Sequence, residues 1–168
     1  RSSDLGAVIT PRPHPAETIM KRLFSIHGGH SRRYCEHARD PLEDIIRTYL
    51  DRGFSRVGIV EHMPPPDDRY LYPEEKAAGL NAEKMRARFR EYVQEVRSLG
   101  RKYADRILIY FGFETESYPG AENYIAELRQ EFQPDYIVGS VHHLGDIPID
   151  FSRGEYLRAQ EAAGGRDN

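Results

Sequence analysis

Residues that can bind metal ions stand directly after four separate apolar runs of this chain. The runs are "LFSI", "RVGIV", "ILIYFGF" and "YIVGSV", and the residues that follow them are His27, Glu61 with His62, Glu114, and His142 with His143. Neutral imidazoles and a few carboxylates are the ligands that proteins supply to Zn²⁺, Mn²⁺ or Fe²⁺. The pattern therefore predicts a divalent metal site, provided that the fold brings four distant segments together.

The first of these segments, "LFSIHGGHSRRYCEHARD", holds two more histidines. His30 and His37 follow His27 at short intervals along it. Gly28 and Gly29 can form a bulge that returns the rings of His27 and His30 to one side of a strand. We expect His37 to reach back to the same place from the loop that follows.

The elements that must position these side chains alternate along the chain. Apolar runs predict strands, and helical spacing of apolar residues predicts helices. The expected strands are 23–27, 57–60, 107–113 and 136–141, and the expected helices are 41–52, 81–103, 118–131 and 153–163. Asp40 is expected to cap the first helix and Asn81 the second, with a loop over 63–79. This alternation is typical of βαβ units, whose parallel strands share one C-terminal rim where ligands bind.

Length limits how much of a barrel the chain can form. A closed (β/α) barrel typically needs about 250 residues, whereas this chain has 168. We expect an open α/β domain, or the front part of a barrel, over residues 23–168. Residues 1–22 are polar and proline-rich, which predicts an N-terminal arm, and they lack the apolar core of a signal peptide. No apolar run approaches the length of a membrane span.

Composition and missing motifs exclude several other functions. The formal charge is −3, and basic residues are interleaved with acids, which argues against nucleic acid as a partner. Neither a G-x-S-x-G nucleophile motif nor a phosphate-binding P-loop is present. Cys35 is the only cysteine, which excludes an internal disulfide and fits a reducing cytoplasm. Cys35 could ligate a metal beside His37, although a buried free thiol is the favoured interpretation.

Four motifs resemble those of the polymerase and histidinol phosphatase (PHP) superfamily, and most closely its monofunctional histidinol-phosphatase branch. They are "HGGHSRRYCEHA", "VEHMPPP", "GFETE" and "GSVHH", between Ile26 and His143. The stretches "YPEEKAAGLNAEK" and "DIPIDF" strengthen the narrower match without obvious chemistry of their own. The resemblance implies an α/β fold, the PHP-type distorted (β/α)7 barrel with a trinuclear metal centre at its C-terminal rim. This chain would supply about the first four β/α units.

The resemblance also implies a role for each candidate residue. His27 and His30 correspond to ligands of a first metal ion, and Glu114 to the carboxylate that bridges it to a second ion, which His142 also binds. His37 and His62 correspond to ligands of a third ion. Glu114 and His142 would be the catalytic residues, and the cofactors would be up to three Mn²⁺, Zn²⁺ or Fe²⁺ ions. Glu116 and His143 fall outside the motif positions, although Glu116 could support a ligand from behind.

The implied reaction is metal-assisted hydrolysis of L-histidinol phosphate to L-histidinol and phosphate, a step of histidine biosynthesis. The partner would be a small phosphorylated substrate, with neither nucleic acid nor membrane, and the location cytoplasmic. Arg69 and the 63–79 loop are candidates for contacting the phosphate. Two alternatives stay open: a PHP hydrolase of another phosphoester, and a truncated metal-binding domain without catalysis.

This sequence departs from the family pattern in two places. The family has His-x-His where this chain has His27-Gly-Gly-His30. The family also supplies a further histidine and an Asp-x-His pair later in the barrel, and neither occurs before Asn168. We therefore expect this chain alone to hold at most one metal ion well and to turn over substrate poorly. We also expect an uncovered sheet edge that favours homo-oligomers.

Overall fold

A parallel sheet forms the centre of the protein. The structure, a computed structural model, describes residues 23–165. Its four-stranded sheet has the order β1-β2-β3-β4, and every neighbouring pair is parallel. The strands are β1 (Leu23–Ser25), β2 (Phe54–His62), β3 (Leu108–Glu114) and β4 (Tyr136–Val138). The predicted parallel sheet is thus confirmed, and the predicted N-terminal arm over 1–22 lies outside the described residues.

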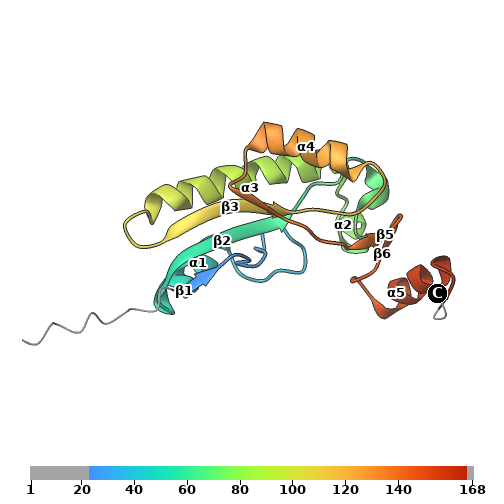
Figure 1. The fold of residues 1–168 in the computed structure, drawn as a ribbon, viewed down its shortest axis with the longest axis horizontal. Helices are drawn as coiled ribbons and strands as arrows, with labels where there is room; N and C mark the ends of the chain where they lie inside the picture. The colour runs from blue at the N-terminus through green and yellow to red at the C-terminus, as the bar shows by residue number, and fades with distance from the viewer. Residues whose placement is uncertain (1–22, 166–168) are drawn as a thin grey trace, which may run out of the picture.

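The main helices all pack on one face of this sheet. They are α1 (Leu42–Asp51), α3 (Ala82–Lys102) and α4 (Ala121–Phe132), and each lies in sequence between two successive strands. Parallel crossovers are almost always right-handed, so strands that follow one another in sequential order place every connecting helix on the same side. Figure 1 shows α3 and α4 running along that side of the twisted sheet. The result is a curled half-barrel, which confirms the predicted partial (β/α) barrel.

The core lies between the sheet and these helices. Alternate residues of β2 and β3, namely Val57, Ile59, Phe111 and Phe113, are buried against the helices. The facing helix residues include Leu42, Ile46, Phe89, Tyr92, Val93 and Val96, which repeat at helical spacing. Each fully buried leucine or isoleucine contributes about 1.5–3 kcal/mol to stability. This layer therefore fixes the sheet that carries the candidate site.

The two predicted helix caps had different outcomes. The side chain of Asn81 accepts a hydrogen bond from the amide of Lys84 at 2.9 Å, which confirms it as the N-cap of α3. The prediction for Asp40 is wrong, because Pro41 occupies the N-cap position of α1 and no side chain caps that helix. Asp40 stands one residue too early to reach the free amides of the first turn.

Several short elements were not predicted. The expected loop over 63–79 contains a 3₁₀ turn, Asp68–Tyr70, and the one-turn helix α2 (Pro73–Ala77). Beyond β4, the two-residue strands β5 (His143–Leu144) and β6 (Ile147–Pro148) form an antiparallel hairpin. The last helix, α5 (Arg153–Ala162), lies beyond this hairpin (Figure 1). Among the described helices, none combines the length and apolar character that crossing a membrane requires.

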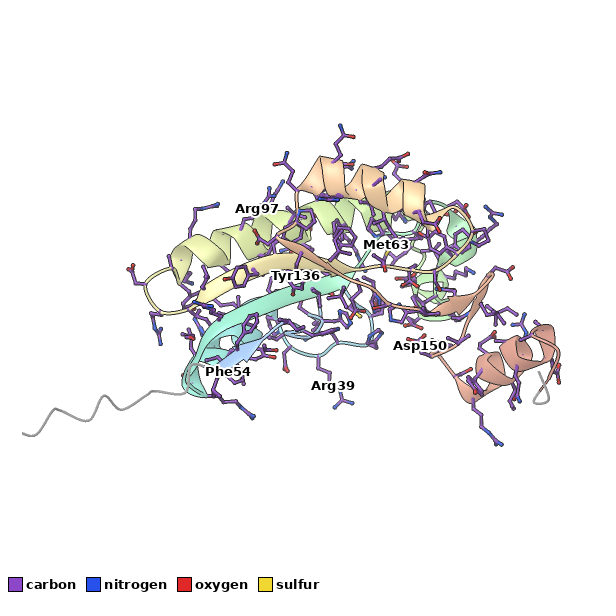
Figure 2. All side chains as sticks on the ribbon, viewed as in Figure 1. Arg39, Phe54, Met63, Arg97, Tyr136 and Asp150 are labelled. Carbon is purple, nitrogen blue, oxygen red and sulfur yellow. The ribbon has the colours of Figure 1, made fainter. Side chains whose placement is uncertain are left out.

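The opposite face of the sheet, which we call the open face, carries no helix in the described part of the chain. Phe24 and Ile26 lie here with 52% and 60% of their surface exposed. Tyr136 projects from β4 across the sheet (Figure 2), and its hydroxyl donates to the carbonyl of Ile26 at 2.7 Å. A Cβ atom at Gly58 or Gly112 would collide with the Tyr136 side chain. These two glycines therefore let the tyrosine lie flat against β2 and β3.

Candidate metal centre

His62 and Glu114 occupy the last positions of β2 and β3 and are partners in the strand register. Successive residues of a strand point to opposite faces. His62 shares a face with Gly58, and Glu114 shares one with Gly112, so both side chains lie on the open face. Parallel pairing thus fixes an imidazole beside a carboxylate, with His62 Nδ1 3.6 Å from Glu114 Oε2.

The glycine pair brings His27 and His30 to the same carboxylate. The amide of Gly28 donates to the carbonyl of Gly58 at 2.7 Å, and a side chain on Gly28 would meet backbone or apolar atoms at 2.8 Å. Gly29 has a φ of 89°, a left-handed conformation that favours glycine. As a result, His27 Nε2 contacts Glu114 Oε1, and the ring centroids of His27 and His30 are 5.6 Å apart.

The remaining two histidines come from loops. His142 follows β4, and its Nε2 lies 3.6 Å from Glu114 Oε2. His37 follows the turn after His30, and its ring centroid lies 5.8 Å from that of His30 and 5.9 Å from that of His62. Four chain segments, far apart in sequence, therefore meet at the C-terminal rim of the sheet.

Three overlapping groups of potential ligands result. In each group, one nitrogen or oxygen per residue lies within 4.8 Å of the others. The groups are His27–His30–Glu114, His62–Glu114–His142 and His30–His37–His62. The structure thus brings together all six residues that the sequence predicted as ligands, while their roles as ligands stay a prediction.

Glu61 holds the segment that carries His27 and His30 in place through hydrogen bonds to Ser31. Its buried carboxylate accepts hydrogen bonds from the amide and the hydroxyl of Ser31, at 2.8 and 2.7 Å. Its second oxygen lies 3.4 Å from His30 Nδ1. Burial alone would lower the pKa of His30, but the nearby carboxylates of Glu61 and Glu114 outweigh burial and raise that pKa. Glu61 was present in the strand-end pattern, but the pattern gave it no role.

Glu116 plays a similar part on the other side of the site. Its carboxylate accepts from His142 Nδ1 at 3.1 Å and from His143 Nδ1 at 2.9 Å. Burial opposes ionisation of Glu116, but the hydrogen bonds from His142 and His143, with His62 Nδ1 nearby at 3.6 Å, outweigh it and lower the pKa of this carboxyl. The hydrogen bond to Glu116 in turn raises the pKa of His142.

A cavity of about 530 Å³ opens over the histidines. Its lining residues are His30, Glu36, His37, His62, Tyr72, Glu74, Glu114, His142, Asp150 and Phe151, with no lysine or arginine among them. Tyr72 and Glu74 belong to the stretch "YPEEK", and Asp150 and Phe151 to "DIPIDF". Both stretches were expected to carry no obvious chemistry, and the structure adds that four of their residues line the cavity. Figure 2 places Asp150 beyond the tips of β2 and β3.

A comparison with known families identifies the chain. The model of the PHP domain family matches residues 28–164. The chain belongs to the PHP domain family. Its relatives include a Schizosaccharomyces pombe protein named "Probable histidinol-phosphatase", 40% identical over 80% of this chain and 44% of the relative. A Saccharomyces cerevisiae protein named "Histidinol-phosphatase" is 31% identical over 79% of this chain and 43% of the relative.

A solved structure supports the fold of this PHP domain. A Listeria monocytogenes protein described as "putative histidinol phosphatase" superposes with a TM-score of 0.62 at 24% identity. The match covers 79% of this chain and 50% of that one. The chain therefore spans about half the length of the relatives it matches, and the likeness at this identity shows the shared fold.

The residues of this PHP domain fit divalent metal ions. His30 Nδ1, His62 Nδ1 and Glu61 Oε2 are buried and lack a hydrogen-bond partner among the described residues. Imidazoles and the Glu114 carboxylate converge there, and no lysine or arginine lines the cavity. Buried charges in proteins are normally paired or coordinate metals. The donor set therefore suits Mn²⁺, Zn²⁺ or Fe²⁺.

Two further candidates do not join the site. Cys35 is a buried free thiol, as predicted, and its Sγ lies 3.1 Å from His37 Nε2. Burial raises the pKa of this thiol to about 12, which keeps it protonated. Arg69 was a candidate for contacting phosphate, but its guanidinium pairs with Asp67 at 2.8 Å and does not line the cavity.

Proposed function

We propose that this chain carries the catalytic metal site of a phosphomonoester hydrolase whose substrate is L-histidinol phosphate. The products would be L-histidinol and phosphate, as a step of histidine biosynthesis. The names of the relatives support this substrate. The observation that carries the proposal is the convergence of five histidines on Glu114 and on one another at the C-terminal rim of the sheet. Divalent ions held there would lower the pKa of a bound water and neutralise charge on the phosphoryl oxygens.

The chain's own residues would hold these ions in a fixed arrangement. Glu114 belongs to two of the three groups, and its two oxygens face different histidines, Oε1 toward His27 and Oε2 toward His62 and His142. We assign catalytic roles to Glu114 and His142 because both line the cavity and would hold the ions at which the phosphoryl group reacts. Glu116 would hold His142 in place through its hydrogen bond to Nδ1, and Glu61 would hold the segment that carries His30 through its hydrogen bonds to Ser31.

The acidic rim of the cavity supports a substrate with a cationic end. Glu74 and Asp150 line the cavity together with the rings of Tyr72 and Phe151, whereas Glu36, also in the lining, pairs with Arg88 at 2.6 Å. Carboxylates repel a bare phosphate but attract an ammonium or imidazolium group, and aromatic faces also favour cations. L-Histidinol phosphate carries an imidazole at the end opposite its phosphate and an amine on the carbon between the two ends. A simple aryl phosphate offers neither group.

Phosphate release tests this function directly. The assay uses L-histidinol phosphate and an aryl phosphate, with and without Mn²⁺, on this chain and on any longer form of it. We expect release only with Mn²⁺, faster from L-histidinol phosphate, and reduced by at least about 100-fold in Glu114→Gln, the scale at which loss of one key electrostatic group acts. The exposed Glu122→Gln on α4 provides a charge-matched control.

Three results would contradict the proposal in different ways. Phosphate release at the same rate with and without Mn²⁺ would show that the metal site takes no part in the reaction. Phosphate release by Glu114→Gln at the wild-type rate would show that the Glu114 carboxylate takes no part in the reaction. Metal binding without release from any phosphomonoester, in the chain and in a longer form, would favour the alternative of a non-catalytic metal-binding domain.

A further inference from the structure

Glu116 lies between two imidazoles and contacts each with a different oxygen. Its Oε1 is 3.1 Å from His142 Nδ1, and its Oε2 is 2.9 Å from His143 Nδ1. The carboxylate is buried, and so is His143, which has only 3% of its surface exposed. Glu116 thus ties a predicted metal ligand to a histidine that none of the three ligand groups contains.

This arrangement constrains the proton positions on both rings. An ionised carboxylate only accepts hydrogen bonds, so each imidazole must carry its proton on Nδ1 to bond to it. A neutral imidazole has one N–H, so Nε2 of His142 then presents a lone pair. That nitrogen faces Glu114 Oε2 at 3.6 Å and the cavity. The lone pair therefore points to the place where a metal ion would bind.

His143 is held so that it can anchor the carboxylate. It begins β5, where it pairs with Pro148, and its carbonyl accepts from the Ser117 hydroxyl at 3.2 Å. Its ring lies against an aromatic wall, with ring centroids at 5.2 Å from Tyr72 and 6.5 Å from Tyr118. With one oxygen fixed by His143, the other oxygen of Glu116 keeps a constant position behind His142.

We propose that Glu116 is a positioning residue that fixes His142 in its Nδ1–H tautomer and aims Nε2 at the metal site, with His143 as the anchor that fixes Glu116. The inference rests on the proposed metal-dependent function, which it deepens. Outer hydrogen-bond partners of this kind set both the tautomer and the orientation of ligating histidines in metal sites.

The tautomer can be measured without metal or substrate. Side-chain ¹⁵N chemical shifts distinguish Nδ1–H imidazole, Nε2–H imidazole and imidazolium, so the spectra are read at an alkaline pH at which the shifts of both rings show no imidazolium. We expect His142 and His143 of the metal-free chain both to be Nδ1–H. In Glu116→Gln the amide offers one acceptor and one donor, so one of the two rings should switch to Nε2–H. An Nε2–H tautomer of His142 in the wild-type chain would overturn the proposal.

Mn²⁺ titration by calorimetry supplies the second readout. Glu116→Leu removes both acceptors and should weaken Mn²⁺ binding by about 10–100-fold, while Glu122→Gln should leave it unchanged. His143→Leu should also weaken binding, whereas His143→Asn, whose amide can donate from the position of Nδ1, should retain most of it. Thermal unfolding of each variant separates lost binding from lost folding.

The outcomes separate this inference from the function on which it rests. If the wild type binds Mn²⁺ and Glu116→Leu, still folded, binds it equally well, the positioning role is wrong while the proposed function stands. If the wild-type chain and a longer form bind no Mn²⁺, the proposed function fails, and the tautomers of the metal-free chain still decide whether Glu116 orients His142. Equal binding by folded His143→Leu and His143→Asn would refute the anchor role.

Discussion

His62 Nδ1 lies 3.6 Å from Glu114 Oε2 because the two residues are register partners at the ends of adjacent parallel strands. Each belongs to two of the three ligand groups. A neutral imidazole has a single lone pair, so His62 can serve only one ion at a time, whereas Glu114 can offer a separate oxygen to each of two ions. The groups His27–His30–Glu114 and His62–Glu114–His142 share only Glu114 and can therefore be filled together.

The first prediction is that the chain binds two divalent ions with three protein ligands each. This revises the expectation of one well-held ion, because the structure adds His62 to the group of Glu114 and His142. His27→Ala should lower the number of bound ions per chain from two to one, and Glu114→Gln should weaken ion binding at both sites. His37→Ala should still bind two ions. Elemental analysis after dialysis against Mn²⁺ gives the numbers. A His37→Ala chain with fewer ions than His27→Ala would contradict this assignment.

The sequence was sufficient to find the ligand candidates but not the residues that support them. His62 and Glu114 were predictable because residues at the ends of parallel strands share a rim. Glu61 also stood in that pattern, but it alternates with His62 and lies on the helix side, where it binds Ser31. Only the folded loop shows this contact. Tyr72 and Asp150 reach the cavity from irregular segments and Glu74 from the one-turn helix α2, and none of these segments is long and regular enough to show a period.

The fold was predictable where elements are long and periodic. Asn81 and the apolar stripe of α3 marked a 21-residue helix almost to its ends. The five-residue helix α2 and the two-residue strands β5 and β6 are too short to produce a period, so they were missed. The Tyr136 side chain crosses the open face and donates a hydrogen bond to Ile26, which is more than 100 residues earlier in the chain. Local sequence patterns do not reveal contacts between such distant residues.

The second prediction concerns the packing of the Tyr136 side chain over Gly58 on the open face. In Gly58→Ala the new Cβ would lie 2.2 Å from the Tyr136 hydroxyl oxygen and 3.0 Å from the Ile26 carbonyl. Overpacking of this kind typically costs about 1–3 kcal/mol. In Gly100→Ala, in the last turn of α3, the new Cβ meets nothing within 4 Å, and the substitution should stabilise by about 0.5–1 kcal/mol. Urea unfolding measures both changes.

A double mutant identifies the cause of the Gly58 effect. Combining Gly58→Ala with Tyr136→Leu should recover most of the loss, because the clashing ring is gone. An undiminished cost of Gly58→Ala in the Tyr136→Leu background would mean that the backbone, and not the tyrosine, requires glycine there.

The third prediction compares the two expected caps. Asn81→Ala removes the acceptor of the Lys84 amide and should lower the free energy of unfolding by about 1 kcal/mol. Asp40→Ala should change it by less than about 0.5 kcal/mol, as is usual for exposed surface substitutions, because Asp40 caps no helix. Asn81→Ser should restore most of the loss. Equal effects of the two alanine substitutions in urea unfolding would contradict this comparison.

The fourth prediction is self-association through the open face. Phe24, in the edge strand β1, and Ile26, directly after it, are exposed, and such apolar edges favour pairing with another copy. Light scattering should show a mass that rises with concentration, and Phe24→Asp or Ile26→Asp should reduce the rise. Leu157→Asp, at an exposed position of α5, is the matched control. A constant monomer mass over the accessible range would exclude association by this chain.

The last prediction concerns stability against pH through Glu75. Burial, with repulsion from Glu74, Glu116 and Glu36, raises the pKa of this carboxyl from 4.5 to about 7, although its hydrogen bond from the Tyr72 amide opposes the rise. Between these two values the folded chain holds more protons than the unfolded chain. The contribution of Glu75 is therefore fully present below about pH 4.5 and is lost as the pH rises through 7.

Glu75→Gln isolates this contribution, because glutamine keeps an acceptor for the Tyr72 amide but does not ionise. Relative to the variant, the metal-free wild type should lose on the order of 1–3 kcal/mol between pH 4.5 and 7.5, measured by urea unfolding at a series of pH values. The exposed Glu127→Gln should follow the wild-type curve. Parallel curves for the wild type and Glu75→Gln would show that Glu75 titrates alike in the folded and unfolded chains. Burial of Glu75 would then not be a source of pH-dependent loss of stability.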